Sequence, residues 1–269
     1  MKRVLMFFGF MLMIYSLNLF TQTADIHAEP LQIKDVSEKN KEFNIKFEDI
    51  KEKTEEYEID MKIPIISGLQ DQVFQVKFNY GIKSKAEDKK KEFIKEAKQF
   101  AQELREKGQP LRPFQLFIEP SVKMQGEIIS IKSEDYIYKG GANGIQKISA
   151  LNILNQKKAK YLTFADLFKE DLDYKEVIND MVKKEIEDRR AKGESFFEGE
   201  EGFQSVTDEQ KFYLEENQLV LAFDEYEIAP GYMGTQTFSI PFAEIHEMLK
   251  PEIYEAIQKS ELVWNQVTH

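Results

Sequence analysis

The chain has 269 residues, of which 42% are hydrophobic and 32% charged, and its formal net charge at pH 7 is −11. It contains no cysteine, which excludes disulfides, thiolate metal sites, a thiol nucleophile and a lipoprotein anchor. Nucleic-acid binding depends on Lys and Arg that neutralise phosphates, so we expect no nucleic-acid partner for such an acidic chain.

Residues 1–28 predict a secretory signal peptide. Lys2 and Arg3 supply positive charge, residues 4–20 are almost wholly apolar, and Ala28 provides a small residue at the exit. The alternative is a retained membrane anchor, although a spanning helix needs about 20 apolar residues and this run is interrupted by polar ones. In both cases we expect an extracellular or cell-envelope location, with membrane contact only through an uncleaved N-terminal segment.

Strands are predicted in the part of the chain that follows. Residues 29–48 are expected to form an extended polar segment, within which residues 43–47 alternate between polar and apolar. Residues 57–63 alternate as well. Residues 73–80 could continue as a strand or begin a helix that runs on, but their apolar positions fit a period of two better than one of 3.6. We therefore expect strands over the last three ranges.

A helix is predicted next. Ser84 and Glu87 have the spacing of a capping box, and Gly108 and Pro110 follow the last position of the helical pattern. Lys89, Lys90 and Lys91 are expected on the solvated face of this helix. Its apolar residues are Phe93, Ala97, Phe100 and Leu104.

A meander of short antiparallel strands is expected after this helix, followed by a sharp turn at residues 140–144 and a strand over residues 145–154. The runs with strand character before the turn are residues 114–118, 122–124, 127–132 and 136–138.

The last third of the chain predicts helices and three further strands. A short helix is expected over residues 163–168. A longer helix is expected to begin at Asp173 and to end at Gly193, with a buried stripe that starts at Val177. A C-terminal helix, broken at Pro251, ends the chain. Strands that are segregated from a few packed helices predict an α+β fold with antiparallel sheets. The three strands are residues 212–214, 219–223 and 237–240.

Histidine is scarce, which limits metal and acid–base chemistry. His27 lies in the signal region and His269 is the last residue, so His246 is the only histidine in the body of the mature chain. A His-rich zinc site is therefore excluded, and a Ser-His-Asp triad would have to use His246, which we expect on a helix surface. We expect no metal and no cofactor.

The sequence contains no phosphate-binding loop, nucleophile elbow or calcium-binding loop. Glu198, Glu200 and Glu201 are expected in a solvated acidic loop rather than at a cation site. Carboxylates are nevertheless abundant, so a hydrolase of envelope polymers that uses carboxylates alone stays open as an alternative. Nothing in the sequence selects one pair of carboxylates for this role.

Residues 224–234 are the most unusual stretch. They place Tyr226, Pro230 and Tyr232 around a glycine-rich turn that follows an apolar strand. Aromatic side chains on a rigid turn provide contact area at low entropic cost, as a recognition loop requires. The alternative is a structural turn whose tyrosines pack inward.

Several of these segments, in their order and spacing, resemble a known two-part extracellular module. Residues 57–69 are similar to the opening of its N-terminal half, and residues 138–144, 160–168 and 219–234, with Asn152, are similar to its C-terminal half. This module is shared by the lysozyme-sensing anti-sigma-V factor RsiV and the N-terminal part of the peptidoglycan deacetylase PdaC.

The resemblance implies an α+β fold, a cell-envelope setting and, from the best-understood member, lysozyme binding. It implies an N-terminal half over residues 49–135, a C-terminal half over residues 136–250 and a C-terminal helix or tail over residues 251–269. The residues that it selects for ligand binding are Gly140, Gly141, Asn143, Gly144, Pro230 and Tyr232, and the unusual stretch described above adds Tyr226. The family's turn usually has His where Asn143 stands, and no sigma-binding segment or deacetylase domain is expected in this chain.

The sequence therefore predicts a binding protein more than an enzyme. We expect a secreted or cell-envelope-associated protein that recognises a lysozyme-like cationic protein or a peptidoglycan glycan. The alternatives are the carboxylate-dependent hydrolase and an inhibitor or accessory protein of an envelope enzyme.

Overall fold

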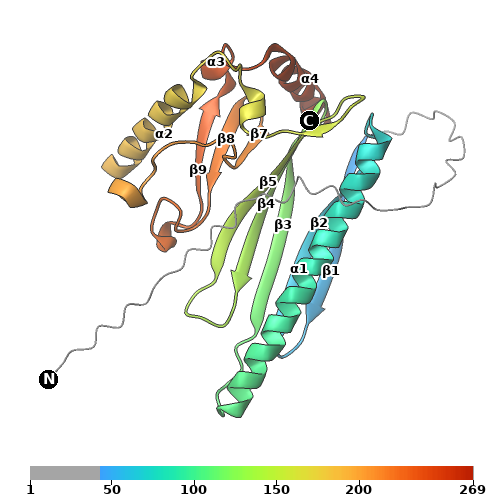
Figure 1. Cartoon of the computed structure of the whole chain (residues 1–269), viewed down its shortest axis with the longest axis vertical. Helices are drawn as coiled ribbons and strands as arrows, with labels where there is room; N and C mark the ends of the chain where they lie inside the picture. The colour runs from blue at the N-terminus through green and yellow to red at the C-terminus, as the bar shows by residue number, and fades with distance from the viewer. Residues whose placement is uncertain (1–42, 269) are drawn as a thin grey trace, which may run out of the picture. The chain divides into compact units, whose positions relative to one another are not determined.

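A computed structural model describes residues 43–268 (Figure 1). The expected signal region, residues 1–28, and most of the expected polar segment lie outside the described residues. In the part of the chain that is described, no helix has both the length and the apolar character that crossing a membrane requires.

The larger of two sheets has six strands in the order β1-β2-β3-β4-β5-β6. All neighbours pair antiparallel except β2 and β3, which are parallel and are joined by the crossover helix α1 (Gln72–Glu106). The α+β fold class is thus confirmed, although one pair departs from the antiparallel expectation. The strands are β1 (Asn44–Lys53), β2 (Tyr57–Ser67), β3 (Phe114–Met124), β4 (Ile128–Tyr138), β5 (Ile145–Leu154) and β6 (Lys160–Tyr161).

The strands predicted over residues 43–47, 57–63 and 145–154 are confirmed by β1, β2 and β5. The four short runs expected between residues 114 and 138 are only two long strands, β3 and β4. Pro120 lies within β3 and pairs with Ser133 of β4. The pairing of β3 with β2 ends at Ile118, so the proline lies where β3 is paired on one side.

Helix α1 begins earlier than predicted, and the strand expected over residues 73–80 is wrong. Asp71 caps the helix by accepting from the backbone N–H of Phe74 at 2.9 Å, so Ser84 lies inside the helix. Phe74 and Phe78, four residues apart, both lie against Tyr161 with ring centroids 5.1 and 6.4 Å away. The apolar positions that suggested alternation are divided between this packed face and solvent.

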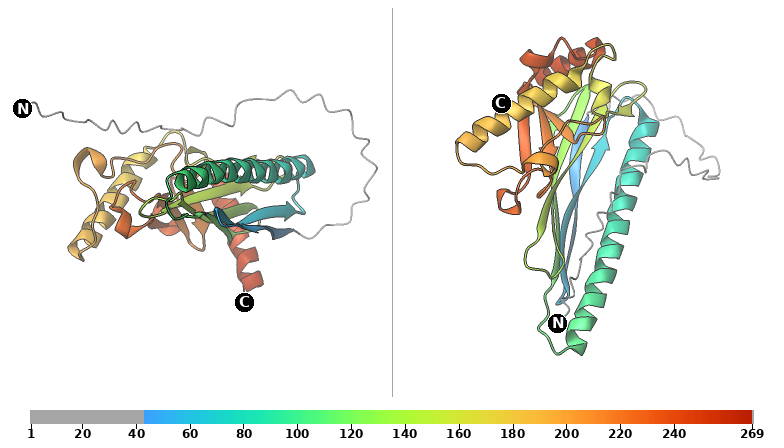
Figure 2. Two further views of the ribbon diagram at one scale, coloured as in Figure 1. Left: turned by 90° about the horizontal axis from the view of Figure 1, so that it is seen from below. Right: turned by 60° about the vertical axis from the view of Figure 1, so that its left-hand side comes forward.

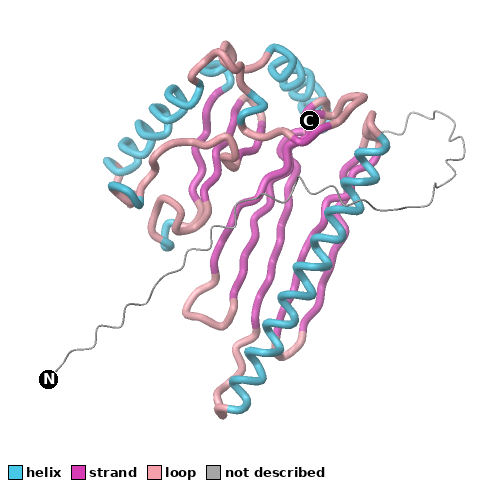
Figure 3. The backbone as a smooth tube through the Cα atoms, viewed as in Figure 1, coloured by secondary structure: helices cyan, strands magenta, loops and turns pink. Residues whose placement is uncertain are grey.

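The smaller sheet has three antiparallel strands, β7 (Phe212–Glu215), β8 (Gln218–Phe223) and β9 (Gln236–Pro241), in that order, as predicted. Figures 2 and 3 show α1 running along one face of the larger sheet and the smaller sheet joined to the other helices. These helices are α2 (Tyr174–Ala191), α3 (Phe242–Ile245) and α4 (Pro251–Thr268), with 3-10 turns η1 (Ala165–Leu167), η2 (Gly199–Glu201) and η3 (Gly231–Met233).

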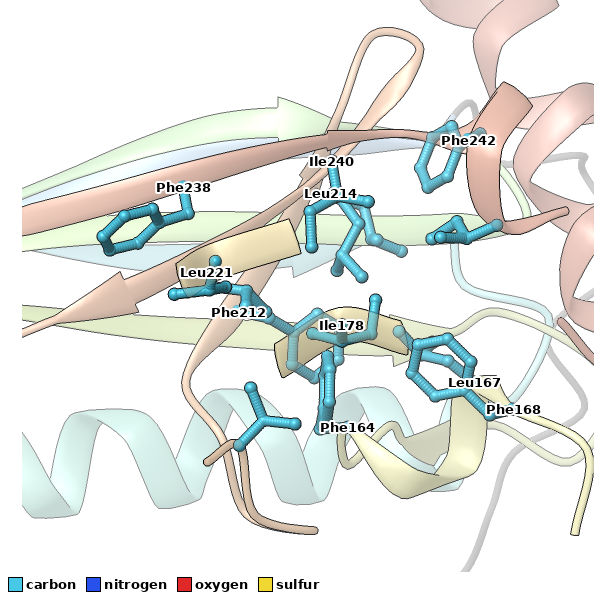
Figure 4. Packing of buried hydrophobic residues seen from close by; sticks show 14 of the residues in the cluster. Phe164, Leu167, Phe168, Ile178, Phe212, Leu214, Leu221, Phe238, Ile240 and Phe242 are labelled. Carbon is cyan, nitrogen blue, oxygen red and sulfur yellow. The ribbon is translucent and has the colours of Figure 1, made fainter. Parts of the chain in front are cut away.

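The largest hydrophobic core lies around the smaller sheet (Figure 4). Helix α2 buries Ile178, Val182 and Ile186 in it, whereas Val177, expected at the start of the buried stripe, is 39% exposed. Phe164 and Phe168 pack edge to face in the same core, with ring centroids 5.1 Å apart. The core is therefore built mainly from aromatic and branched aliphatic side chains.

A buried polar seam fastens the two sheets together. Ser130 of β4 donates to Asn152 Oδ1 of β5 at 2.7 Å and accepts from the backbone N–H of Leu214 at 2.9 Å. Asn152 Nδ2 donates to the carbonyl of Phe212 at 2.8 Å. Because buried polar groups need partners, these bonds fix β7 in one place on β4 and β5.

The division expected between residues 135 and 136 lies within β4, and strands on both sides of it belong to one sheet. This division into halves stays a prediction. Of the expected polar segment, residues 44–48 form the first half of β1.

Candidate functional site

Residues of the 140–144 turn and of the 230–234 segment line one groove of about 620 Å³, which we call the loop groove. Of the seven residues predicted for ligand binding, Asn143, Gly144 and Tyr232 line it; Gly140, Gly141, Tyr226 and Pro230 lie in the same loops without lining it. The other lining residues are Gln115, Tyr136, Tyr138, Ala142, Gln146, Glu225, Gly231, Met233 and Gly234.

Gly140 positions the turn. Its φ is +76°, and a Cβ there would lie 2.3 Å from Cε1 of Phe100 on α1. Arg112 Nη1 donates to the Gly140 carbonyl at 3.3 Å, and the Tyr138 hydroxyl donates to the Gly141 carbonyl at 3.0 Å. The turn therefore needs glycine at 140 for backbone reasons, because both φ and the close approach disfavour a side chain.

Asn143 and Gly144 present the turn to the groove. Asn143 is exposed. A Cβ at Gly144 would lie 2.3 Å from the Tyr136 ring, so glycine allows this ring to lie against the backbone. The Tyr136 ring also stacks on Phe117 of the neighbouring strand, with ring centroids 5.8 Å apart and an angle of 19° between the ring planes. An aromatic pair is thus held beside the turn.

Three hydrogen bonds bring the second loop to the first. The backbone N–H of Ile148 donates to Asp224 Oδ1 at 2.9 Å, and that of Gln146 donates to Glu225 Oε2 at 2.7 Å. The Glu225 N–H donates back to the Gln146 carbonyl at 3.2 Å. Lys211 pairs with Asp224 at 2.7 Å. These bonds attach the start of the 224–234 segment to the start of β5, directly after the glycine turn.

Neither tyrosine of the 224–234 segment packs inward. Tyr226 is 54% exposed with a φ of +68°, and its ring lies against Gly231, where a Cβ would be 2.1 Å from the ring. Tyr232 is 77% exposed, and its hydroxyl donates to Ser195 Oγ. The turn itself closes through the Met233 N–H, which donates to the Pro230 carbonyl at 2.9 Å.

Gln236 and Arg189 hold the end of the 224–234 segment in place through hydrogen bonds. Gln236 is 3% exposed, and its side-chain amide donates to the carbonyls of Met233, Gly234 and Thr235 at 2.7, 3.3 and 3.1 Å. Arg189 of α2 donates to Gln236 Oε1 and pairs with Glu194 at 2.7 Å. Loop carbonyls bound to a buried amide are held in one geometry, so the exposed Tyr232 stands on a rigid base.

A second groove of about 420 Å³ shares Tyr136 and Gln146 with the loop groove. Glu119, Glu134 and Asp135 line it, with Lys147 as the only lysine or arginine among its lining residues. Together with Glu225, these carboxylates give the two adjoining grooves an acidic lining.

Two glutamates of the second groove, Glu119 and Glu134, lie opposite each other, and each is also paired with a lysine. Glu119 and Glu134 are direct partners across β3 and β4, so the hydrolase alternative has a pair of neighbouring, groove-lining carboxylates. However, Glu119 pairs with Lys62 and Glu134 with Lys132.

Histidine and acidic clusters do not add to the groove. His246 is exposed after α3, as predicted, and its Nδ1 lies 3.0 Å from the carbonyl of Ala243. Glu200 and Glu201 are exposed in η2. Within residues 43–268 no three His, Asp or Glu side chains are arranged so that they could hold a metal ion.

Sequence reasoning missed Gln115, Tyr136, Tyr138, Gln146 and Glu225. The tyrosines carried a usable signal, because they alternate on β4 immediately before the glycine turn and therefore share one face of the strand. Glu225 carried no such signal, because its position depends on a hydrogen bond to Gln146, which lies 79 residues earlier in the chain.

The fold and the groove define an α+β module in which loops from two distant segments meet beside an aromatic pair. Residues 50–146 match the family described as Deacetylase PdaC, and residues 165–243 match the family described as Protein of unknown function (DUF3298).

Two relatives from Bacillus subtilis (strain 168) align with this module. The chain is 29% identical over 219 residues to the anti-sigma-V factor RsiV, covering 78% of this chain and 72% of RsiV. It is 27% identical over 177 residues to the peptidoglycan-N-acetylmuramic acid deacetylase PdaC, covering 65% of this chain and 37% of PdaC. The chain carries the module that RsiV and PdaC share, which confirms the predicted resemblance.

Two solved structures have the same fold. A DUF3298 family member from Bacteroides fragilis NCTC 9343 superposes with a TM-score of 0.63 at 18% identity, covering 82% of this chain and 98% of that one. A DUF3298 family protein from Pseudomonas aeruginosa PAO1 gives a TM-score of 0.54 at 14% identity, covering 80% and 97%.

Proposed function

We propose that this chain is a secreted or cell-envelope-associated binding protein whose loop groove recognises a lysozyme-like cationic protein or a peptidoglycan glycan. The relationship to RsiV and PdaC supports the envelope setting. The chain spans only 37% of PdaC, so the deacetylase activity in that protein's name is not part of the proposal. One observation carries the assignment: two loops far apart in the sequence line one groove.

The groove has the properties that a protein ligand requires. Exposed aromatic side chains on fixed backbones act as binding hot spots because little entropy is lost when they are covered. The carboxylates of the adjoining groove favour a cationic partner and speed its approach at low salt. A glycan would use the same features differently, by stacking on Tyr232 or Tyr136 and bonding to Gln146 and Asn143.

The test is retention of hen lysozyme by the immobilised protein at low and at moderate salt, with soluble peptidoglycan fragments as a second ligand. Tyr232→Ala should weaken binding by roughly tenfold to a hundredfold, the range for removal of an interface tyrosine. Tyr80→Ala is the matched control, because Tyr80 is 72% exposed on α1 and outside the groove. Undiminished binding by Tyr232→Ala would remove this loop from the site.

If the immobilised protein retains no lysozyme at either salt concentration, the lysozyme version of the proposal is wrong. Binding of the peptidoglycan fragments then decides whether the ligand is a glycan. A lytic-activity assay separates a simple binder from an inhibitor, because only an inhibitor lowers the rate at which lysozyme clears cell walls. Bond cleavage by the purified protein that is abolished by Glu134→Gln would establish the hydrolase alternative instead.

A further inference from the structure

Strand β1 is an edge strand of the larger sheet, with β2 as its only neighbour in the sheet (Figure 1). It pairs with β2 over all ten of its residues, Asn44–Lys53. Helix α1 packs on the neighbouring strands β2 and β3, where Phe93 shares a cluster with Ile59 and Phe114. The side of β1 that faces away from β2 is therefore an open sheet edge.

The pairing with β2 decides which backbone groups of β1 point outward. The Thr54 N–H donates to the Tyr57 carbonyl at 2.8 Å, and hydrogen-bonded and unbonded pairs alternate from there along the antiparallel ladder. Phe47 therefore stands at an unbonded position, in agreement with its partner Pro64, which has no N–H. Within the described residues, no hydrogen bond of the outward N–H and C=O groups is seen. These groups belong to Ile45, Phe47, Asp49, Lys51 and Lys53.

This edge lacks most of the features that keep edge strands single. Such strands are usually short, bulged or interrupted by proline, or they carry free lysines. Strand β1 has ten residues and no proline, and its register with β2 does not shift. Lys51 and Lys53 are held in ion pairs with Asp60 and Glu58 of β2, each at 3.0 Å. The edge is thus long enough and regular enough to pair with another strand.

The sequence of β1 favours a second copy of itself as that strand, in one register. Outward residues must face outward residues, so the two-fold axis of such a pair passes through a single residue position. An axis at a charged residue sets that side chain against its own copy, and an axis at Ile50 sets Glu48 against Glu52. An axis at Phe47 brings no like charges together over residues 43–51: Lys46 faces Glu48 of the second copy.

We propose that this protein forms a two-fold dimer in which the β1 strands of two copies pair antiparallel at Phe47 and join the two larger sheets into one. The outward groups of Ile45, Phe47 and Asp49 of both copies then form about six hydrogen bonds. Phe47, which is 37% exposed, is covered by its own copy. Lys46 is exposed without an ion pair, and Glu48, which pairs with Lys83, has a side chain that is 53% exposed and can accept a second cation.

The first test is disulfide cross-linking of the purified protein, whose chain has no cysteine of its own. The Cα atoms of the two copies of Phe47 lie about 5.5 Å apart in the proposed pair, within the range of a disulfide. Mild oxidation of Phe47→Cys should therefore give a covalent dimer. Asp49→Cys is the matched control at the next outward position. Its two copies lie about 14 Å apart, so it should cross-link at least about tenfold more slowly.

The second test exchanges the charges beside the axis and measures the dimer by sedimentation velocity. Lys46→Glu and Glu48→Lys should each weaken dimerisation at least about tenfold, because each sets like charges opposite one another twice. An equimolar mixture of the two variants should dimerise like the unchanged protein, because every carboxylate of one copy then faces an ammonium of the other. Lys53→Glu, which changes the charge of β1 outside the paired residues 43–51, should also dimerise like the unchanged protein.

The proposal is overturned if the unchanged protein stays monomeric up to a concentration on the order of 100 µM, the limit expected for a small interface. It is also overturned if Asp49→Cys cross-links as fast as Phe47→Cys, or if the mixture of charge variants stays monomeric. The two tests use different variants, so one variant that fails to fold leaves the other test intact. The loop groove contains no residue of β1, so lysozyme retention is tested independently.

Discussion

At the scale of single residues, two adjacent glycines of the 140–144 turn have different duties. Gly140 is buried with φ at +76° and has Phe100 against it, whereas Gly141 is exposed and its nearest neighbour to a new Cβ is 3.9 Å away. Both were predicted to bind ligand. The geometry supports a conformational duty for Gly140 and leaves ligand contact to Asn143 and Gly144, which line the groove.

Gly140→Ala should therefore lower the free energy of unfolding by about 2 kcal/mol or more, because a left-handed backbone costs an L-residue 1–2 kcal/mol and the Phe100 clash adds to this. Gly141→Ala is the matched control and should change stability by less than about 0.5 kcal/mol. Urea unfolding of both variants measures the difference. Equal stability of the two variants would contradict the role given to Gly140.

The raised pKa of Tyr213 leads us to expect a loss of stability in alkaline solution. Burial, followed by the nearby charges of Glu215 and Glu134, raises the pKa of Tyr213 to about 12. The unfolded chain, with a tyrosine pKa near 10, loses this proton first. The stabilisation is thus complete below pH 10 and is lost as pH rises from about 10 to 12.

Tyr213→Phe should accordingly flatten the fall in unfolding free energy between about pH 10 and 12, because the titrating hydroxyl is gone. Tyr80→Phe, at an exposed position, should leave the slope as it is. Denaturant unfolding at a series of pH values gives both slopes. An unchanged slope for Tyr213→Phe would show that other groups cause the alkaline loss.

At the scale of elements, the union of the two sheets depends on the polar seam of Ser130 and Asn152. Ser130→Ala leaves the buried Leu214 N–H and Asn152 Oδ1 without this partner, and should cost about 1–3 kcal/mol. Ser121→Ala, at an exposed position of β3, should cost less than about 0.5 kcal/mol. Chemical denaturation measures both, and a Ser130→Ala variant as stable as the control would refute the importance of the seam.

The sequence predicts elements well where one periodicity is unambiguous. Residues 57–63 alternate cleanly and form β2, and Asp173 opens α2 as a cap that accepts from the Glu176 N–H at 3.2 Å. Residues 73–80 mislead because Val73, Val76 and Tyr80 are exposed apolar residues on a helix, and so mimic the alternation of a strand. Burial by tertiary contacts, which local patterns do not encode, decided the outcome.

The candidate groove was only partly predictable for a related reason. The resemblance to the RsiV/PdaC module pointed to Asn143, Gly144 and Tyr232, which the fold brings together. It gave no sign that Glu225 would bond to the Gln146 backbone, or that Gln236 would hold three loop carbonyls. These contacts join segments far apart in sequence, or depend on burial, and they give the loops their relative positions.

At the scale of the whole molecule, the larger sheet has two different sides. Helix α1 packs against one side, where Phe114 and Leu116 of β3 lie in its core cluster. Phe117 and Tyr136, the aromatic pair beside the loop groove, project from the other side, because successive side chains of a strand point to opposite faces. The smaller sheet and the polar seam then hold the 224–234 segment beside β5. Recognition by the two loops as one surface is the central claim.

Amide hydrogen exchange of the protein with and without saturating hen lysozyme tests this claim most directly. Exchange should become slower in residues 141–146 and in residues 225–234 together, with α1 unchanged. Slower exchange in only one of these segments, or protection confined to α1 or β1, would contradict a recognition site built from both loops.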